Sequence, residues 1–134
     1  MSTEKKPDFA ADAEAAVQLE AEAKAGPDVR TYTHTFAEPF EFRGRTVTEL
    51  TFNWGALTGE DHQAIEDEVL RRGKTLVLPA YTGPFLNGMA IRACTNRDDN
   101  GIRILDDDFL KAMPFMDYQK IFMSARRFLL RSGS

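Results

Sequence analysis

The chain has 134 residues and a formal net charge of −4, so it is the size of one domain and too short for a large enzyme. Its composition is 43% hydrophobic and 28% charged, as in globular proteins, and no apolar run approaches the roughly 20 residues that span a bilayer. The first residues are polar and acidic and lack the apolar core of a secretory signal. We therefore expect a protein that stays in the cytoplasm.

The charge is unevenly placed along the chain. Residues 1–28 contain seven acidic residues and three lysines, whereas residues 29–134 contain fourteen residues of each sign. The longer part has neither a net charge nor a polybasic run, and so gives no electrostatic reason to bind nucleic acid or an anionic membrane. We expect neither partner, and we divide the chain into an acidic leader, residues 1–28, and a single domain, residues 29–134.

The leader is rich in alanine between Asp8, a suitable N-cap, and the Gly26-Pro27 stop. This composition predicts a helix, with disorder before Asp8. The helix has too few large apolar residues for a strong core-facing stripe, so it is expected to be marginal when undocked. Those apolar residues are Phe9, Val17 and Leu19.

Residues 29–54 alternate between apolar and polar side chains, which is the period of a β-strand. The Arg43-Gly44 pair interrupts this pattern with a residue that tolerates positive φ, so we predict an antiparallel hairpin with Pro39 in an irregular portion. Two sets of residues are expected to share a face: Tyr32, His34 and Phe36 in the first strand, and Leu50, Phe52 and Trp54 in the second.

Helical signals fill the rest of the chain. Thr58 is predicted to cap a helix that ends before Gly73, and a short buried segment at Leu76–Leu78 precedes a second helix from Gly83-Pro84. The inner face of the first helix is expected to consist of Leu57, Ile65, Val69 and Leu70, and that of the second of Phe85, Leu86, Met89, Ala90 and Ala93.

The last two helices are separated by Pro114. Asp106 is predicted to cap a short helix, and residues 115–131 carry the clearest helical periodicity in the chain. The core-facing stripe of that closing helix is Tyr118, Ile121, Phe122, Ala125, Phe128 and Leu129. The fold class is therefore α+β, with an N-terminal β-hairpin packed on a small group of helices and a long amphipathic C-terminal helix.

Residues suited to catalysis are few. Nucleophilic catalysis needs a base beside the nucleophile, and the two histidines stand outside any recognised motif: His34 is expected to face a neighbour in the hairpin, and His62 to be partly exposed. The His62 and Glu66 pair could supply only two metal ligands, no glycine-rich phosphate loop is present, and Cys94 is expected to be a buried thiol. We expect no enzyme, no metal and no cofactor.

A partial match to a calcium loop begins at Asn96. Oxygen-bearing side chains stand at loop positions one, three and five, glycine stands at position six, and Asp107 at position twelve. The match departs from the pattern because position one is an amide and position twelve is the shorter aspartate. A polar turn and a small calcium-binding module are both open interpretations.

A second apolar stripe runs along the closing helix. Met116, Met123 and Leu130 recur at heptad spacing, away from the core stripe, with Lys120 and Arg127 beside them. A surface helix needs only one apolar face. Either this helix is buried on two sides, or the five residues form a methionine-containing partner-binding face for an apolar helix of another protein or a second copy of the chain.

The order of several short motifs resembles the tail assembly chaperones of long-tailed phages and prophages. The resemblance covers residues 29 to 130, and the leader and the segment from Pro79 to Gly101 depart from it. The motifs are Phe40-Glu41-Phe42-Arg43-Gly44-Arg45, Thr48-Glu49-Leu50-Thr51-Phe52, Leu57-Thr58-Gly59-Glu60-Asp61, and Asp117-Tyr118 leading to Phe128-Leu129.

The resemblance implies a non-enzymatic factor in the cytoplasm of a bacterial host. Such a factor binds the long helical tape measure protein, keeps it soluble and helps tail tube subunits assemble around it, and members of the family are often made in a longer frameshifted form as well. The implied partners are the tape measure protein and the tail tube protein, and a homo-oligomer is a further open interpretation. The alternative is a structural tail or neck component, which unlike a chaperone would remain in purified virions.

Overall fold

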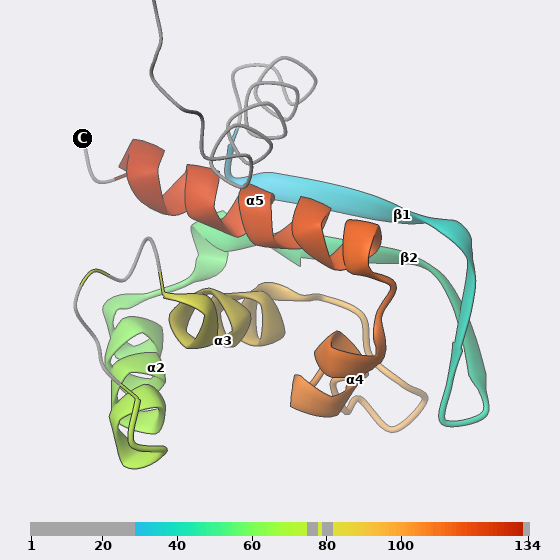
Figure 1. Ribbon diagram of the computed structural model, residues 1–134, viewed down its shortest axis with the longest axis horizontal. Helices are drawn as coiled ribbons and strands as arrows, with labels where there is room; N and C mark the ends of the chain where they lie inside the picture. Colours follow the sequence, from blue (N-terminus) through green and yellow to red (C-terminus); the bar gives the residue numbers. More distant parts are fainter. Residues whose placement is uncertain (1–28, 75–77, 79–81, 133–134) are drawn as a thin grey trace, which may run out of the picture.

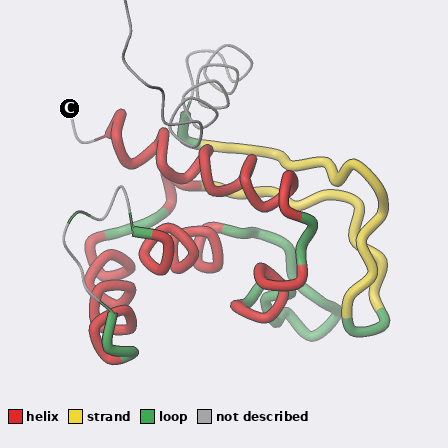
Figure 2. Tube along the Cα trace, in the orientation of Figure 1, coloured by secondary structure: helices red, strands yellow, loops and turns green. Residues whose placement is uncertain are grey.

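The computed structural model describes residues 29–74, 78 and 82–132. Within these residues a two-stranded antiparallel sheet is combined with helices (Figures 1 and 2), which confirms the α+β fold class. The predicted leader helix lies outside the described residues, as do the first two residues of the predicted Leu76–Leu78 segment. The elements in chain order are β1 (Thr31–Phe42), β2 (Arg45–Asn53), the 3-10 turn η1 (Trp54–Ala56), α2 (Gly59–Arg71), α3 (Gly83–Ala93), α4 (Asp107–Ala112) and α5 (Phe115–Ser132).

The hairpin forms as its turn sequence predicts. Arg43 and Gly44 both adopt positive φ, at 54° and 75°, as a two-residue turn that matches the twist of the strands requires. The strands pair from Phe42 opposite Arg45 onward, and the register shifts between Thr35 and Phe40. This irregular portion contains Pro39, whose missing N–H cannot join a regular ladder.

Two of the helices begin at the capping residues that the sequence predicts. Thr58 and Asp61 form a reciprocal capping box at α2, with the Asp61 backbone N–H donating to the Thr58 hydroxyl and the Thr58 N–H donating to the Asp61 carboxylate. Asp106 accepts a hydrogen bond from the Phe109 backbone N–H at the start of α4. Pro114 then separates α4 from α5, which extends one residue beyond the predicted end at 131.

The core lies between the hairpin and the helices. In Figure 1, α5 runs along the hairpin. Helix α3 packs against both α5 and α2. One face of the hairpin and the predicted faces of α3 and α5 meet in a single hydrophobic cluster. Its least exposed large members are Leu50, Phe52, Trp54, Phe85, Leu86, Leu105, Phe109 and Ile121.

Two predicted core positions are wrong. Leu70 was expected on the inner face of α2 but is 55% exposed, because Ile65 and Val69 already face α3 and the next residue is rotated by about 100° around the helix. Leu78 was expected in a buried segment but is 52% exposed. Leu57 is half-buried and packs against the core as predicted.

A close helix contact fixes the position of α2 against α3. An added Cβ at Gly88 of α3 would lie 2.7 Å from Cγ2 of Ile65 in α2, a separation that side chains do not tolerate without movement. Ile65 is β-branched and buried, so its methyl group has little freedom to move away. The two helices can therefore approach this closely only because residue 88 is a glycine.

We predict that Gly88→Ala lowers the free energy of unfolding, even though alanine favours the helix. The steric cost of about 1–3 kcal/mol should exceed the gain in helix propensity of about 1 kcal/mol. Chemical denaturation measures the change, with Gly83→Ala as a control at a glycine of the same helix that has open space around it. Equal stability of Gly88→Ala and the wild type would contradict this account of the contact.

Candidate interaction surface

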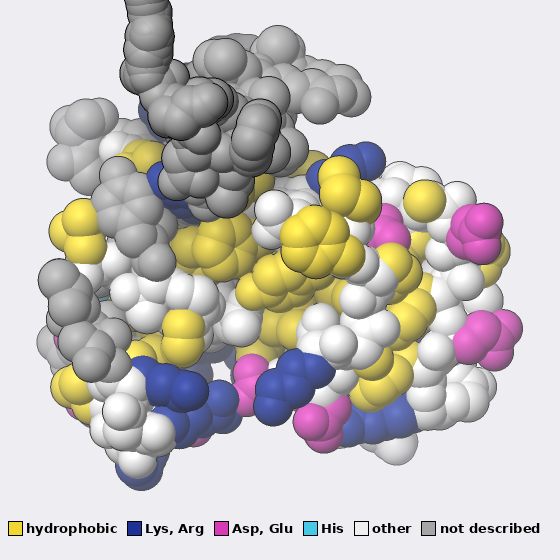
Figure 3. All heavy atoms as spheres, in the orientation of Figure 1, with side chains coloured by type: hydrophobic (Ala, Val, Ile, Leu, Met, Phe, Trp, Pro, Cys, Tyr) yellow, Lys and Arg dark blue, Asp and Glu magenta, His cyan; other side chains and the backbone are white. Residues whose placement is uncertain are grey.

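The start of α5 presents apolar side chains to solvent. Phe115, the first residue of the helix, is 71% exposed and Met116 is 54% exposed. Figure 3 shows hydrophobic side chains gathered in a band across this face of the molecule, over α5. A large exposed aromatic residue beside other apolar surface is typical of a site that another molecule covers.

A groove adjoins these two residues. Its volume is about 300 Å³, and it lies between the end of α4, the start of α5 and α3. We call it the Phe115 groove, and it is lined by Asn87, Leu110, Lys111, Met113, Phe115 and Tyr118. Apolar side chains with a few polar groups are the usual lining of a site that binds an apolar ligand.

One wall of the Phe115 groove is held by a hydrogen bond. The Tyr118 hydroxyl donates to Oδ1 of Asn87 at 2.6 Å, which joins α5 to α3. Burial raises the pKa of Tyr118 above its usual value of 10.0, so the phenol remains protonated and able to donate at neutral pH. The wall therefore carries no negative charge, and the hydrogen bond ties it to α3.

The predicted partner-binding stripe is not a continuous exposed surface. Met116 and Leu130 are 54% and 39% exposed and Lys120 is also exposed, whereas Met123 and Arg127 are only 1% and 3% exposed. Three of the five residues are thus exposed and two are buried, and whether the five residues bind a partner stays a prediction. Periodicity identifies residues that share a face of a helix but not what packs on that face.

Phe115 is the residue that the sequence pattern missed. It stands three positions before Tyr118, at the spacing of the core stripe, so periodicity gives no sign that it is exposed. The sequence feature that could have indicated its exposure is its position directly after Pro114. The first residue of a helix that follows a proline break between two helices can project beyond the packed body of the domain.

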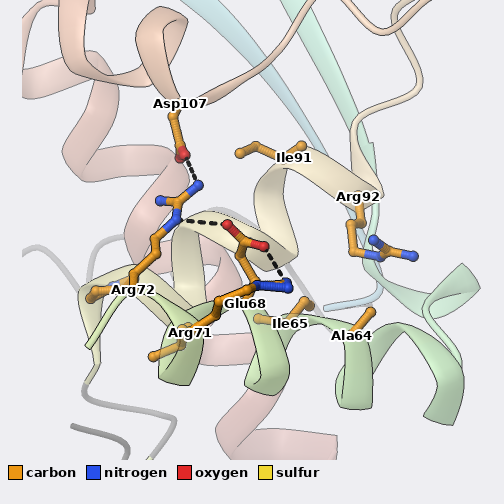
Figure 4. Close-up of a pocket in the computed structure, with 11 residues that line it drawn as sticks. Ala64, Ile65, Glu68, Arg71, Arg72, Ile91, Arg92 and Asp107 are labelled. Carbon is orange, nitrogen blue, oxygen red and sulfur yellow. Dashed lines mark hydrogen bonds and ion pairs between the residues drawn. The ribbon is translucent and has the colours of Figure 1, made fainter. Parts of the chain in front are cut away.

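A second cavity lies between α2 and α3. It has a volume of about 330 Å³, and Ile65, Val69 and Ile91 are among its apolar lining residues. Figure 4 shows the side chain of Arg72 reaching between Glu68 and Asp107, with N···O distances of 2.8 and 2.5 Å. Glu68, Arg72 and Asp107 at its rim are thus engaged with one another. Among the described residues that line the cavity, none is a serine, threonine, cysteine or histidine that could serve as a nucleophile or an imidazole base.

His34 belongs to a buried network rather than an open site. Its Nε2 donates to the Asp117 carboxylate at 2.9 Å, and its Nδ1 lies 3.0 Å from the Tyr32 hydroxyl. His34 and Asp117 are 1% and 4% exposed, which leaves no room for a substrate. The network joins β1 to α5. Its contact with Tyr32 agrees with the prediction that His34 faces a neighbour in the hairpin, whereas the contact with Asp117 of α5 was not predicted.

The candidate metal ligands point to different partners. His62 Nδ1 is 3.8 Å from Glu66. In the calcium-like loop, Asn96 accepts a hydrogen bond from Thr51, Asp98 accepts two from the backbone of its own turn, and Asp107 pairs with Arg72. Among the described residues, no three histidine, cysteine, aspartate or glutamate side chains come close enough to hold a metal ion.

Comparisons with family models, curated proteins and solved structures found no match. In the part of the chain that the structure describes, no helix combines the length and the apolar character needed to cross a membrane.

Cys94, the single cysteine of the chain, is 1% exposed, and burial raises the pKa of its thiol. This thiol is therefore a poor candidate for a nucleophile.

The His34 network predicts a pH dependence of stability. Burial lowers the pKa of His34 below 6.5, although the hydrogen bond that His34 donates to Asp117 opposes the shift. The unfolded chain therefore binds more protons than the folded chain as pH falls below about 6.5, and stability is lost from there down to the folded pKa. Denaturation at pH 7.5, 6.5 and 5.5 should show this loss, and His34→Gln should reduce it.

The control for this experiment is His62→Gln, which removes an exposed imidazole from α2. It should keep the wild-type dependence of stability on pH. If His34→Gln and His62→Gln change the dependence equally, then the buried network is not its source.

Proposed function

We propose that this protein is a tail assembly chaperone of a long-tailed phage or prophage that binds the tape measure protein without catalysis. The observation that carries the proposal is the exposed apolar surface formed by Phe115, Met116 and the Phe115 groove. It supports a protein that covers an apolar segment of another polypeptide. The resemblance of the hairpin and helix motifs to the chaperone family supplies the client.

The dimensions of the Phe115 groove suit the side chains of a helix. An amphipathic client helix presents apolar residues three and four positions apart, and one or two such side chains fill a space of about 300 Å³. Phe115 itself would be covered at the same time, and burial of an aromatic ring contributes roughly 1.5–3 kcal/mol. Contacts of this size favour reversible binding, as a factor that is released during assembly needs.

The charges around the groove favour one kind of client. Lys111 lines the groove and Lys120 is exposed one turn along α5 from Met116. Acidic residues beside the apolar stripe of the client would lie near these lysines, and this pairing would steer the encounter more than it strengthens the complex. We therefore expect the bound segment to be an apolar helix with acidic flanks.

Phe115→Glu tests the proposal in cells that also produce the tape measure protein. The wild-type chain should hold the client in the soluble fraction and co-purify with it. Phe115→Glu should reduce co-purification by about tenfold or more, because a loss of 1.4 kcal/mol or more of binding free energy corresponds to that factor. Phe115 is mostly exposed, so the melting temperature should stay near that of the wild type.

The matched control is Leu70→Glu, which places the same charge at an exposed apolar residue of α2. This variant should retain the client. Full co-purification with Phe115→Glu, or an equal loss with both variants, would contradict the assignment of the Phe115 groove. A client that never co-purifies with the wild-type chain would contradict the chaperone function itself.

A further inference from the structure

A further cavity lies where the tip of the hairpin meets the loop between α3 and α4. In Figure 1 this loop passes beside the turn of the hairpin before the chain enters α4. The cavity has a volume of about 250 Å³ and shares no lining residue with the Phe115 groove. We call it the hairpin-tip cavity, and its lining includes Phe42, Arg45, Ile102, Arg103 and Phe109.

The apolar lining of the hairpin-tip cavity has a fixed part and an open part. The rings of Phe42 and Phe109 meet edge to face with their centroids 5.1 Å apart, and Phe109 is 1% exposed. Ile102 of the loop lines the same cavity but is 61% exposed. A single exposed isoleucine is ordinary on a protein surface, whereas one that lines a cavity offers apolar area that a ligand can cover.

One of the three arginines among the described lining residues is committed to the fold. Arg43 donates to Asp106 at 2.6 Å and to Asp108 at 3.1 Å, and its guanidinium carbon lies 4.6 Å from the centroid of the Phe42 ring. Asp106 also accepts a hydrogen bond from the Phe109 backbone N–H. These contacts tie the hairpin turn to α4, so Arg43 and Asp106 support the cavity instead of binding a ligand.

The other two arginines have no such role. Arg45 and Arg103 are exposed, and neither guanidinium group forms a hydrogen bond or an ion pair with a described residue. They share the cavity with Asp98, whose carboxylate accepts hydrogen bonds from the backbone N–H groups of Ile102 and Asn100. These two bonds lower the pKa of Asp98 more than the charge of Arg45 does. Two guanidinium groups thus stand beside one carboxylate that its own turn already engages.

We propose that the hairpin-tip cavity binds a small apolar carboxylate. The apolar part of the ligand lies against Phe42, Phe109 and Ile102. Arg45 and Arg103 donate hydrogen bonds to its carboxylate oxygens, because the planar guanidinium group matches the geometry of a carboxylate. A single negative charge suits this site, since Asp98 repels a doubly charged phosphate more strongly.

The size of the cavity limits the ligand to about one side chain. Its volume lies below the roughly 300–1,000 Å³ of sites that hold drug-sized ligands. Two sources share the required chemistry, namely a free carboxylic acid with an apolar body and the C-terminal residue of a polypeptide with an apolar side chain. The proposal is independent of the chaperone function, because it uses a separate surface.

Titration of the full chain with N-acetylphenylalanine, followed by the amide chemical shifts in NMR, tests the site. Saturable shifts are expected at residues 42–45 and 98–104 and not in α2. The neutral amide of N-acetylphenylalanine keeps the ring and lacks the charge, so it should bind about tenfold more weakly or worse. A peptide of three glycines followed by a C-terminal phenylalanine separates the two sources. Binding about tenfold tighter than that of N-acetylphenylalanine assigns the site to a polypeptide C-terminus, and equal binding assigns it to a free acid.

Variants at the cavity test the role of each group. Arg45→Gln and Arg103→Gln should each weaken the binding of N-acetylphenylalanine by about tenfold, and Ile102→Ser should weaken the acid and its amide alike. All three residues are exposed, so the melting temperatures should stay near that of the wild type. The matched control is Arg71→Gln, which removes an exposed arginine of α2 and should leave binding unchanged.

Three results would overturn the proposal. The first is the lack of saturable shifts at residues 42–45 and 98–104 with both the acid and the peptide. The second is equal affinity for the acid and its neutral amide, which would leave the two arginines without a role. The third is wild-type affinity in both Arg45→Gln and Arg103→Gln.

Discussion

The attachment of α5 to the hairpin determines which surfaces of this protein face outward. Two buried polar contacts make the attachment: His34 with Asp117, and the Trp54 indole with the Ser124 hydroxyl at 3.0 Å. A buried polar group without a partner costs roughly 1–3 kcal/mol, so α5 cannot rotate about its axis or slide along β1 without breaking both contacts. Apolar packing alone would allow several rotations of similar energy, whereas these bonds select one.

This one orientation separates α5 into regions with different environments. The side of Ile121 and Ala125 enters the core, the first turn projects Phe115 and Met116 into solvent, and the side of Met123 faces away from the core. The same helix can therefore stabilise the fold and leave an apolar surface at its first turn open to solvent. Its length of 18 residues is what makes room for these separate regions.

Features with local causes were predictable from the sequence. The positive φ values at Arg43 and Gly44, the Thr58 capping box and the break at Pro114 depend on residues next to one another in the chain. Period-two and period-3.6 patterns similarly indicated most of the buried faces. The exposed state of Leu70 was not predictable in this way, because it depends on which residues of α2 face α3 in the packed fold.

The candidate interaction surface depends even more on contacts between distant segments. Phe115 and Met123 have the composition and spacing of ordinary helical residues, and only the packing around them leaves the first open and the second buried. The Phe115 groove combines Asn87 of α3 with residues of α4 and α5, which no local pattern connects. Sequence motifs suggested the client that we propose, and the three-dimensional packing shows the exposed apolar surface to which the proposal assigns it.

Hydrogen exchange of the full chain with and without a soluble segment of the tape measure protein tests the central claim most directly. If the protein binds its client through the Phe115 groove, backbone amides of α4 and the first half of α5 should exchange more slowly in the complex, while those of α2 should not change. Protection confined to α2 and the cavity beside it, or an unchanged exchange pattern at saturating client, would contradict the account.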